Sequence, residues 1–303
     1  MRVLVTGAGG FIGAQVVKTL LARGHRVIAL DRRLDVVQDG VTGLEGDLAD
    51  PALIGRALSF DPDAVIHLAA LPGGAAEQDP ALSRRINLDA SLDLVEAAGR
   101  RRPRIRFVYA STIAVFGDPL PAEGVNDDTP TAPRLIYGAH KAMMETAIGA
   151  LSRRGQVEGV CLRLPGVVAR PRGAAGLKSA FMSDLFHSLK AGERFVSPVG
   201  PEATLWLMSV VRAADNLVLA LDVPTTRLPV SRVVTLPALR VRMDALLEAV
   251  RAEVGASAGC YAFDPDPALQ AAFGAHPPLK TPVAESLGFS HDGDLCALVQ
   301  QVL

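Results

Sequence analysis

Tyr137 and Lys141 are the residues whose types and spacing most directly suggest chemistry. Residues four positions apart on a helix project from the same face, so this pair would hold a phenol beside an ammonium group. A neighbouring ammonium stabilises the phenolate and lowers the tyrosine pKa from about 10 toward neutrality, as a general acid/base requires. An amphipathic helix with an exposed lysine has the same spacing, so the pair alone does not establish catalysis. His140 faces elsewhere on such a helix and is given no role.

A glycine-rich turn follows the first predicted strand. Residues 3–5 are apolar, residues 6–13 read Thr-Gly-Ala-Gly-Gly-Phe-Ile-Gly, and apolar residues at helical spacing follow as far as Gly24. Such a turn lets backbone amides at a helix N-terminus approach a pyrophosphate, where the peptide dipoles favour negative charge. The sequence therefore predicts a dinucleotide site here. Its predicted contacts are Gly7, Gly10, Phe11, Ile12 and Gly13.

Asp31 ends the second predicted strand, residues 26–30, at the distance from the glycine turn where an acid accepts hydrogen bonds from a ribose diol. An acid at this place selects NAD. Arg32 and Arg33 offer the alternative, because a guanidinium there could hold the 2′-phosphate of NADP. A solvated aspartate at a strand end is the structural alternative.

Asp47 and Leu48 follow a third short strand, residues 41–45, and would lie at the same sheet edge. There they could flank an adenine, or they could simply form a turn. Residues 64–70 are nearly all apolar, as in a strand buried on both faces, and His67 within them is interpreted as a core residue. Small residues from 71 onward form a predicted loop at a carboxyl strand end, where doubly wound sheets bind ligands.

A long helix is predicted over residues 80–99, and the basic run at 100–104 after it is interpreted as a solvated helix end. The buried strand 105–110 then delivers Ser111 and Thr112 to the same carboxyl edge. A long irregular segment separates them from the helix 137–154, and the strand 159–164 follows. This alternation predicts an α/β fold with a doubly wound, Rossmann-type parallel sheet.

The pattern changes near Pro165, where we place a domain boundary. Residues 1–165 are predicted to form the NAD-binding domain. Residues 166–303 are predicted to form a smaller, mixed α/β substrate-binding domain, some of whose segments return to the main sheet. Looser helices are predicted there at 177–191, 210–221, 238–254, 264–273 and 292–303.

Composition favours an enzyme of small molecules. The chain has 303 residues, 31 basic against 32 acidic, and a net charge of -1, which gives no electrostatic reason to expect nucleic acid or an anionic membrane as partner. The three cysteines, Cys161, Cys260 and Cys296, are far apart, so neither a metal site nor a disulfide framework is predicted. The apolar run after Met1 is too short for a signal sequence or membrane span, and a cytoplasmic location is expected.

These motifs, in this order, resemble those of the extended short-chain dehydrogenase/reductase family, also called the NAD-dependent epimerase/dehydratase family. The set comprises residues 6–13, Asp31, Asp47-Leu48, His67-Leu-Ala-Ala70, Ser111-Thr112, Tyr137-x-x-x-Lys141 and Arg163-Leu-Pro165. The resemblance implies that Tyr137 is the acid/base, that Lys141 binds the nicotinamide ribose, and that Thr112, or its neighbour Ser111, hydrogen-bonds the reacting oxygen. Further cofactor contacts that it implies are Leu68, Ala69, Ala70, Asn87, Pro165 and Val167. It also implies a homodimer, built on the helices predicted at 80–99 and 137–154.

Two substrate classes compete within this family. Residues 204–210, Thr-Leu-Trp-Leu-Met-Ser-Val, lack the Arg, the His or Tyr and the Asp often seen in nucleotide-sugar enzymes. Residues 114–121, 137–143, 162–165 and 206–209 resemble the D-erythronate dehydrogenase subfamily, which oxidises a four-carbon sugar acid at C2. That subfamily would have an Asn-Lys pair near 175–176, where this chain has Ala-Gly. The candidate substrate contacts are Gly74, Thr112, Tyr137 and two cations for a carboxylate, Arg172 and Lys178.

The sequence thus predicts an NAD-dependent oxidoreductase that oxidises a secondary alcohol of a small hydroxy acid, such as D-erythronate at C2. A nucleotide-sugar epimerase or dehydratase with tightly bound NAD is the first alternative. A non-catalytic redox sensor that keeps only the dinucleotide site is the second.

Overall fold

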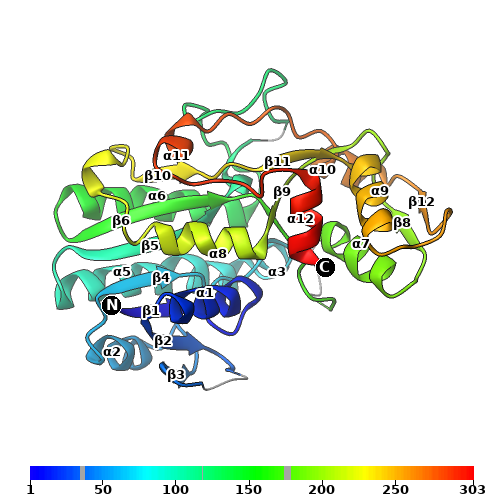
Figure 1. The fold of residues 1–303 in the computed structure, drawn as a ribbon. Helices are drawn as coiled ribbons and strands as arrows, with labels where there is room; N and C mark the ends of the chain where they lie inside the picture. Colours follow the sequence, from blue (N-terminus) through cyan, green and yellow to red (C-terminus); the bar gives the residue numbers. More distant parts are fainter. Residues whose placement is uncertain (35–37, 118, 174–178) are drawn as a thin grey trace. The chain divides into compact units, whose positions relative to one another are not determined.

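The computed structural model describes residues 1–34, 38–117, 119–173 and 179–303. Its main feature is a seven-stranded sheet in which every neighbouring pair is parallel, with strand order β10-β6-β5-β4-β1-β2-β3 (Figure 1). The strands are β1 (Arg2–Thr6), β2 (Arg26–Asp31), β3 (Val41–Glu45), β4 (Ala64–His67), β5 (Ile105–Thr112), β6 (Val157–Leu164) and β10 (Val233–Thr235). The predicted doubly wound α/β fold is confirmed.

The strand order reverses at β1, which pairs with β2 on one side and β4 on the other. In a doubly wound sheet, ligands bind outside the carboxyl ends of the strands at such a switch point. Here that point is where Thr6 and His67 end their strands side by side. The fold therefore selects this edge for the candidate site.

Helices cover both faces of the sheet. Figure 1 shows α1 (Phe11–Ala22) and α8 (Val210–Leu219) in front of it, and α5 (Ala90–Arg101) and α6 (Ile136–Arg153) behind it. The core behind the sheet also includes α2 (Pro51–Ser59), which begins at Asp50, whose carboxylate accepts a hydrogen bond from Ala52 N. Apolar side chains of α2, α5 and α6 pack on the buried strands.

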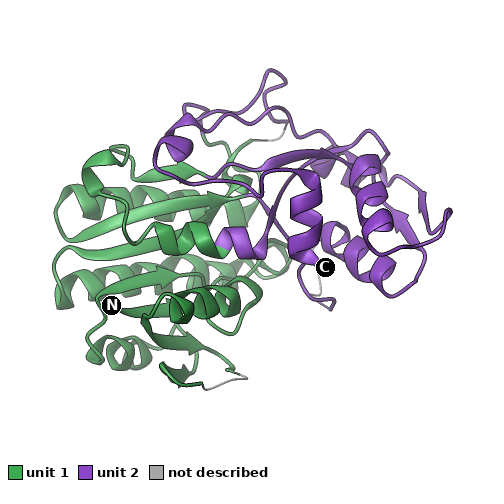
Figure 2. Ribbon diagram, in the orientation of Figure 1, with its two compact units in different colours: residues 1–117, 131–164, 214–235 green, residues 118–130, 165–213, 236–303 purple. Residues whose placement is uncertain are grey.

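The described chain divides into two compact units, coloured separately in Figure 2. Unit 1 comprises residues 1–117, 131–164 and 214–235 and contains the seven-stranded sheet. Unit 2 comprises residues 118–130, 165–213 and 236–303. Its strands are β7 (Gly166–Val168), β9 (Thr204–Ser209) and β11 (Leu239–Arg242) in one sheet, and β8 (Phe195–Ser197) and β12 (Tyr261–Phe263) in another. Its helices are α7 (Phe181–Lys190), α9 (Met243–Glu253), α10 (Pro267–Phe273), α11 (Pro282–Ser286) and α12 (Leu295–Val302).

Several predicted elements differ from the observed ones. The loop predicted after β4 contains a short helix, α3 (Gly73–Gln78). The helix predicted over 80–99 is divided into α4 (Pro80–Ser83), a π-helical segment η1 (Arg84–Asp89) and α5. Residues 239–242 form β11 and not the start of a helix, since their alternation, Leu-Arg-Val-Arg, has the period of a strand. The structure also contains the short 3-10 helices η2 (Ile113–Val115) and η3 (Thr225–Arg227).

Across the described ranges, no helix combines the length and the apolar character needed to cross a membrane.

Candidate active site

The glycine turn lies at the carboxyl end of β1 and leaves no room for side chains. Gly7 has φ +71°, and a Cβ there would lie 2.7 Å from Ala69 N. A Cβ on Gly13 would lie only 1.9 Å from the Gly7 carbonyl oxygen. Gly10 precedes α1, and no described side chain caps that helix, so its first amides have no intrahelical or side-chain acceptor. These donors, at a helix N-terminus, suit the phosphates of a dinucleotide.

Asp31 is held beside this turn at the end of β2. Its Oδ2 accepts a hydrogen bond from Gly9 N at 2.9 Å, and its Oδ1 accepts one from Arg32 N at 2.6 Å. A Cβ on Gly9 would lie 2.4 Å from the Arg33 carbonyl oxygen, so the turn and the residues after β2 fit closely together. The structure thus brings the predicted ribose acceptor to the predicted phosphate site.

The other predicted adenine-side residues lie at the same edge. Asp47 accepts from Ala49 N at 2.9 Å and pairs with Arg85 at 3.0 Å, while Leu48 is buried. Asn87, on η1, bonds both backbone groups of Leu71, with distances of 2.7 Å to the nitrogen and 2.9 Å to the oxygen. That amide therefore fixes the segment after β4, which contains the half-buried residues Leu68, Ala69 and Ala70.

Lys141 is almost completely buried at the start of α6. Its side chain is 2% exposed, and its Nζ donates a hydrogen bond to the Ala110 carbonyl oxygen on β5 at 2.6 Å. The Nζ lies 4.5 Å from the ring centroid of Tyr109 and 5.7 Å from that of Tyr137. Burial lowers the pKa of Lys141 to about 7, although Cys161 and Glu145 nearby oppose the shift. Tyr137 and Lys141 thus lie close together, as their spacing predicts, and the ammonium group of the lysine titrates near neutrality.

Ser111 and Thr112 end β5, but their side chains have different partners. Ser111 Oγ donates to Glu145 Oε1 at 2.5 Å, and this carboxylate also forms a bidentate pair with Arg163, at 2.9 and 2.8 Å. Thr112 Oγ1 accepts a hydrogen bond from Ala114 N at 3.1 Å. The serine hydroxyl is therefore committed to a buried ion pair, and the threonine hydroxyl proton is not.

Sequence reasoning missed Glu145. It lies four residues after Lys141 on α6, so helical spacing places it on the same buried face. Its side chain is 5% exposed and that of Arg163 is 10% exposed, and the Arg163 guanidinium also stacks over the Phe116 ring at 4.9 Å. A glutamate one turn beyond a buried lysine was the signal that could have found it.

His67 is a satisfied core residue, as expected from its place in a buried strand. Its Nδ1 lies 2.5 Å from Thr6 Oγ1 and its Nε2 lies 2.8 Å from Ser91 Oγ. Burial, with a smaller contribution from the charge of Lys141, lowers its pKa to about 3, so the ring is neutral at physiological pH. His140 contacts Ser83 Oγ at 3.0 Å.

The remaining predicted site residues are spread over both units. The first turn of α3 lies beside Tyr137, since a Cβ on Gly73, next to Gly74, would lie 3.9 Å from the Tyr137 ring. Arg172, in unit 2, pairs with Glu193 at 2.5 Å and bonds Ser188 at 2.8 Å. Lys178 lies outside the described residues. Unit 2 also contains the predicted cofactor contacts Pro165 and Val167.

Comparison with known proteins agrees with this geometry. Residues 3–212 match the family described as "NAD dependent epimerase/dehydratase family". The chain belongs to this family. It is 39% identical over 268 residues to the D-erythronate dehydrogenase of Cupriavidus necator, covering 84% of this chain and 82% of that protein. It is 34% identical over 254 residues to the D-erythronate dehydrogenase of Haemophilus influenzae, covering 82% and 80%.

Among solved structures, the nucleoside-diphosphate-sugar epimerase from Agrobacterium tumefaciens is similar over 99% of this chain and 92% of that one, with a TM-score of 0.90 and 27% identity. Membership of the family, with dehydrogenases among the relatives, identifies an enzyme that uses a nicotinamide cofactor and acts on a CH–OH group.

Proposed function

We propose that this protein is an NAD-dependent dehydrogenase that oxidises a secondary alcohol of a small sugar acid, with D-erythronate, at C2, as its substrate. The observation that carries the proposal is the bond from Lys141 Nζ to Ala110 O near the carboxyl end of β5. Tyr137 lies one turn before Lys141 on α6, Thr112 is the last residue of β5, and all three belong to the unit that holds the glycine turn. The choice of D-erythronate as substrate is supported by two relatives named D-erythronate dehydrogenase, each matched over most of its length.

Proton transfer is assigned to Tyr137. Removing hydride from a secondary alcohol requires a base for the hydroxyl proton, and a phenolate beside an ammonium can act as that base. Lys141, 5.7 Å from the ring centroid, supplies the positive charge, and its bond to Ala110 O holds it in place. When bound, NAD would accept the hydride.

Thr112, rather than Ser111, is assigned to the reacting oxygen. Thr112 accepts from Ala114 N and keeps its hydroxyl proton for a substrate, while Ser111 donates to Glu145. Replacing Thr112 by Val removes the donor with little change in shape, and we expect a large loss of kcat. Ser111→Ala should instead lower thermal stability, with the smaller effect on kcat. The opposite ranking of the two variants would exchange their roles.

The residues that would hold the cofactor fit it on local grounds. The glycines at 7 and 13 keep side chains out of the turn, and the first amides of α1 lack acceptors. NAD is proposed over NADP because the Asp31 carboxylate lies against this turn, bonded to Gly9 N, where it would accept from a ribose diol and repel a 2′-phosphate. Arg32 and Arg33 are exposed next to it.

The direct test follows NADH absorbance with D-erythronate and a panel of other aldonates and hydroxy acids. Turnover of D-erythronate in preference to the panel is the expected result. Tyr137→Phe should abolish turnover while NAD still binds, as measured by fluorescence titration. Full activity of this variant would remove the tyrosine from the mechanism.

A nucleotide-sugar epimerase is the second candidate, favoured by the solved epimerase that superposes on nearly the whole chain. An epimerase returns the hydride to its substrate and so releases no net NADH. Conversion of a nucleotide sugar by the purified protein, with no NADH formed from any hydroxy acid, would decide for it.

We further propose a cytoplasmic homodimer that uses α5 and α6. Met143, on α6, is a large apolar side chain with 51% of its surface exposed, and association of two copies would cover it. Sedimentation at low concentration tests the dimer, and Met143→Glu should favour the monomer.

A further inference from the structure

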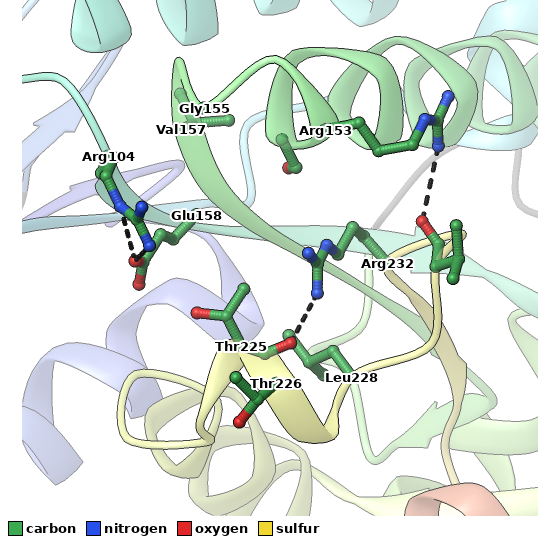
Figure 3. A pocket seen from close by; sticks show the side chains of 11 residues that line it. Arg104, Arg153, Gly155, Val157, Glu158, Thr225, Thr226, Leu228 and Arg232 are labelled. Atoms are coloured by element: carbon green, nitrogen blue, oxygen red, sulfur yellow. Dashed lines mark hydrogen bonds and ion pairs between the residues drawn. The ribbon is translucent and has the colours of Figure 1, made fainter.

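A pocket of about 540 Å³ lies in unit 1 near the amino ends of β5 and β6 (Figure 3). The candidate active site lies at the carboxyl ends of the strands. The lining of the pocket comes from the residue before β5, the turn between α6 and β6, and the segment before β10. We call it the amino-edge pocket, and its polar lining includes Arg104, Arg153, Glu158, Thr225 and Arg232. The catalytic assignments above make no use of these residues.

The pocket lies where the sheet edge is incomplete. Strand β10 pairs with β6 only from Cys161 onward, so the first residues of β6 have no described strand on that side. Gly159 N donates instead to Ser152 Oγ, at 3.0 Å. The volume of the amino-edge pocket falls within the range of small-molecule sites, about 300–1,000 Å³.

Positive charge is in excess around it. Arg104, Arg153 and Arg232 line the pocket. Arg106 is outside the lining but pairs with the lining residue Glu158 at 3.5 Å, as Arg104 does at 3.0 Å, so that four guanidiniums lie in or next to the pocket. Glu158 and Asp222 are the acids whose charges act on Arg106. Four cations against two acids leave a formal excess of two positive charges.

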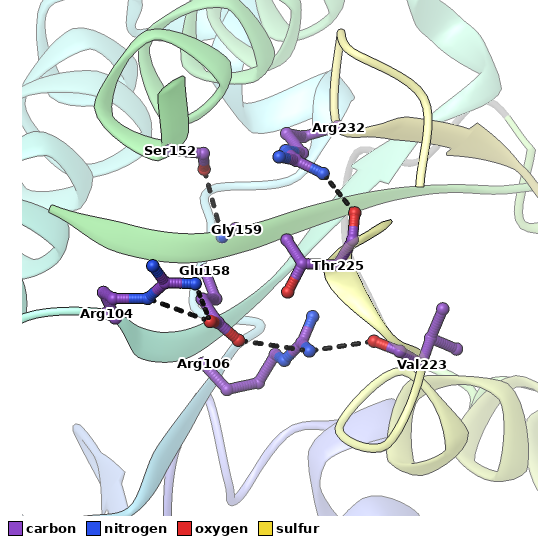
Figure 4. A network of polar contacts seen from close by, with 8 residues as sticks. All are labelled: Arg104, Arg106, Ser152, Glu158, Gly159, Val223, Thr225 and Arg232. Atoms are coloured by element: carbon purple, nitrogen blue, oxygen red, sulfur yellow. Dashed lines mark hydrogen bonds and ion pairs between the residues drawn. The ribbon is translucent and has the colours of Figure 1, made fainter. Parts of the chain in front are cut away.

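Two buried guanidinium nitrogens of this cluster have no acceptor among the described residues. These are Arg106 Nη1 and Arg232 Nε. Arg106 Nη2 donates to Val223 O at 2.8 Å besides pairing with Glu158, and Arg232 Nη1 donates to Thr225 O at 2.6 Å (Figure 4). Burial lowers the pKa of Arg106, and repulsion from Arg232 lowers it further, against the opposing charge of Glu158. A buried donor without an acceptor is costly, and two on neighbouring cations point to a missing anion.

Unusual backbone geometry occurs at two arginines of the pocket lining, Arg104 and Arg232. Apart from glycine, the described residues with positive φ are Asp61, Arg104 and Arg232, the arginines at +63° and +64°. Aspartate is enriched in this left-handed region because its short side chain can bond locally, but arginine is not. Both arginines flank the pocket, and backbone strain of this kind clusters at binding and catalytic sites.

We propose that the amino-edge pocket binds a small oxyanion, a phosphate or a phosphomonoester group, between Arg106 and Arg232. A phosphate has several acceptor oxygens, which match the planar forks of the guanidiniums and would satisfy both orphan donors. Arg104 and the hydroxyls at Thr225 and Thr226 complete the lining. No contact with the oxyanion is assigned to Arg153, because the C-terminus of α6 favours a cation there without any ligand.

The experiment titrates inorganic phosphate into the full-length protein by calorimetry, at ionic strength held constant with chloride. Saturating NAD is present in one series and absent in another, because phosphate could also occupy the glycine turn. We expect saturable binding of one phosphate that persists with NAD. Arg232→Gln should weaken it about tenfold, the effect of removing one charge-assisted hydrogen bond.

Two further variants separate a site from a general charge effect. Thr226→Glu adds a negative charge on an exposed lining residue and should abolish binding, a larger effect than that of Arg232→Gln, without affecting the fold. Arg154→Gln makes the same change in net charge on an exposed residue outside the lining, and should leave the Kd within about twofold. Melting curves by circular dichroism identify any variant that fails to fold.

Absence of saturable phosphate binding to the wild-type protein would overturn the proposal. So would equal weakening by Arg154→Gln and Thr226→Glu, because that pattern indicates screening and not a site. Binding that disappears when NAD is added would place the phosphate at the glycine turn, which also refutes the amino-edge site. None of these outcomes depends on which substrate the enzyme oxidises.

Discussion

The lowered pKa of Lys141 predicts how the free energy of unfolding changes with pH, whatever the substrate is. Its ammonium is buried, and its pKa falls from 10.5 to about 7 in the folded, cofactor-free protein. Between these two values the unfolded chain binds a proton at this lysine and the folded chain does not. Stability therefore rises with pH in this window, since the unfolded state holds more protons.

The size of the effect follows from the two pKa values. Each pKa unit corresponds to about 1.36 kcal/mol, and integrating from pH 7 to pH 9 gives a gain of about 2 kcal/mol in the free energy of unfolding. Other buried groups act outside this range. The lowered pKa of His67 affects stability only below about pH 6.5, while the raised pKa values of Cys161 and Tyr109 act from about pH 9 upward.

The assay is urea unfolding of the cofactor-free protein at pH 7, 8 and 9, followed by far-UV circular dichroism, for wild type and Lys141→Met. Removing the lysine removes its titration, so the stability of the variant relative to wild type should fall by about 2 kcal/mol from pH 7 to pH 9. Lys18→Met, which removes an exposed lysine on α1, should run parallel to wild type. A constant difference between Lys141→Met and wild type across the three pH values would refute the buried, neutral lysine.

Three further changes test the turn, the buried ion pair and the cofactor choice. Gly13→Ala places a methyl group 1.9 Å from a carbonyl oxygen of its own turn and should abolish NAD binding in a fluorescence titration, whereas Gly55→Ala, in open space on α2, should add about 0.5–1 kcal/mol of stability. Glu145→Gln leaves a buried guanidinium without its counter-charge and should cost about 3–5 kcal/mol in urea unfolding, while the exposed Glu193→Gln should have little effect on the midpoint. Asp31→Ser should shift the ratio of kcat/KM for NAD to that for NADP by about tenfold or more toward NADP, and an unchanged ratio would argue against the carboxylate as the selector.

The parts of the fold with local signals were predictable from the sequence. A glycine turn between an apolar strand and an amphipathic helix defines its own geometry, because a Cβ at Gly13 cannot fit. Strands β4 and β5, buried on both faces, are nearly continuous apolar runs, and β3 has the bounds predicted for it. These local patterns were enough to predict the doubly wound sheet and its carboxyl edge.

The elements with only long-range partners were not predictable. Strand β10 has three residues and pairs with β6, which lies more than 60 residues earlier in the chain. The residues Val233–Thr235 contain no local pattern that predicts this pairing. Likewise, Leu239–Arg242 pairs with β9 and was merged into the following helix, because its apolar residues continue that helix's pattern. Pairing that closes long loops depends on tertiary packing, which local propensity does not encode.

The spacing of Tyr137 and Lys141 is not enough for proton transfer, because the charge of the lysine also depends on the buried residues around it. A lysine buried alone loses its charge near neutrality, and a neutral amine does not stabilise a phenolate. Glu145 counters this, because its carboxylate raises the lysine pKa, although Arg163 holds both of its oxygens and offsets much of that charge. Ionisation of the tyrosine would favour protonation of Lys141 by the same interaction that favours the phenolate, so the two groups titrate together. The pH at which the enzyme gains activity should therefore report the coupled titration of Tyr137 and Lys141 and not the pKa of the phenol alone. This pH should be lower when Glu145 is replaced by a neutral residue.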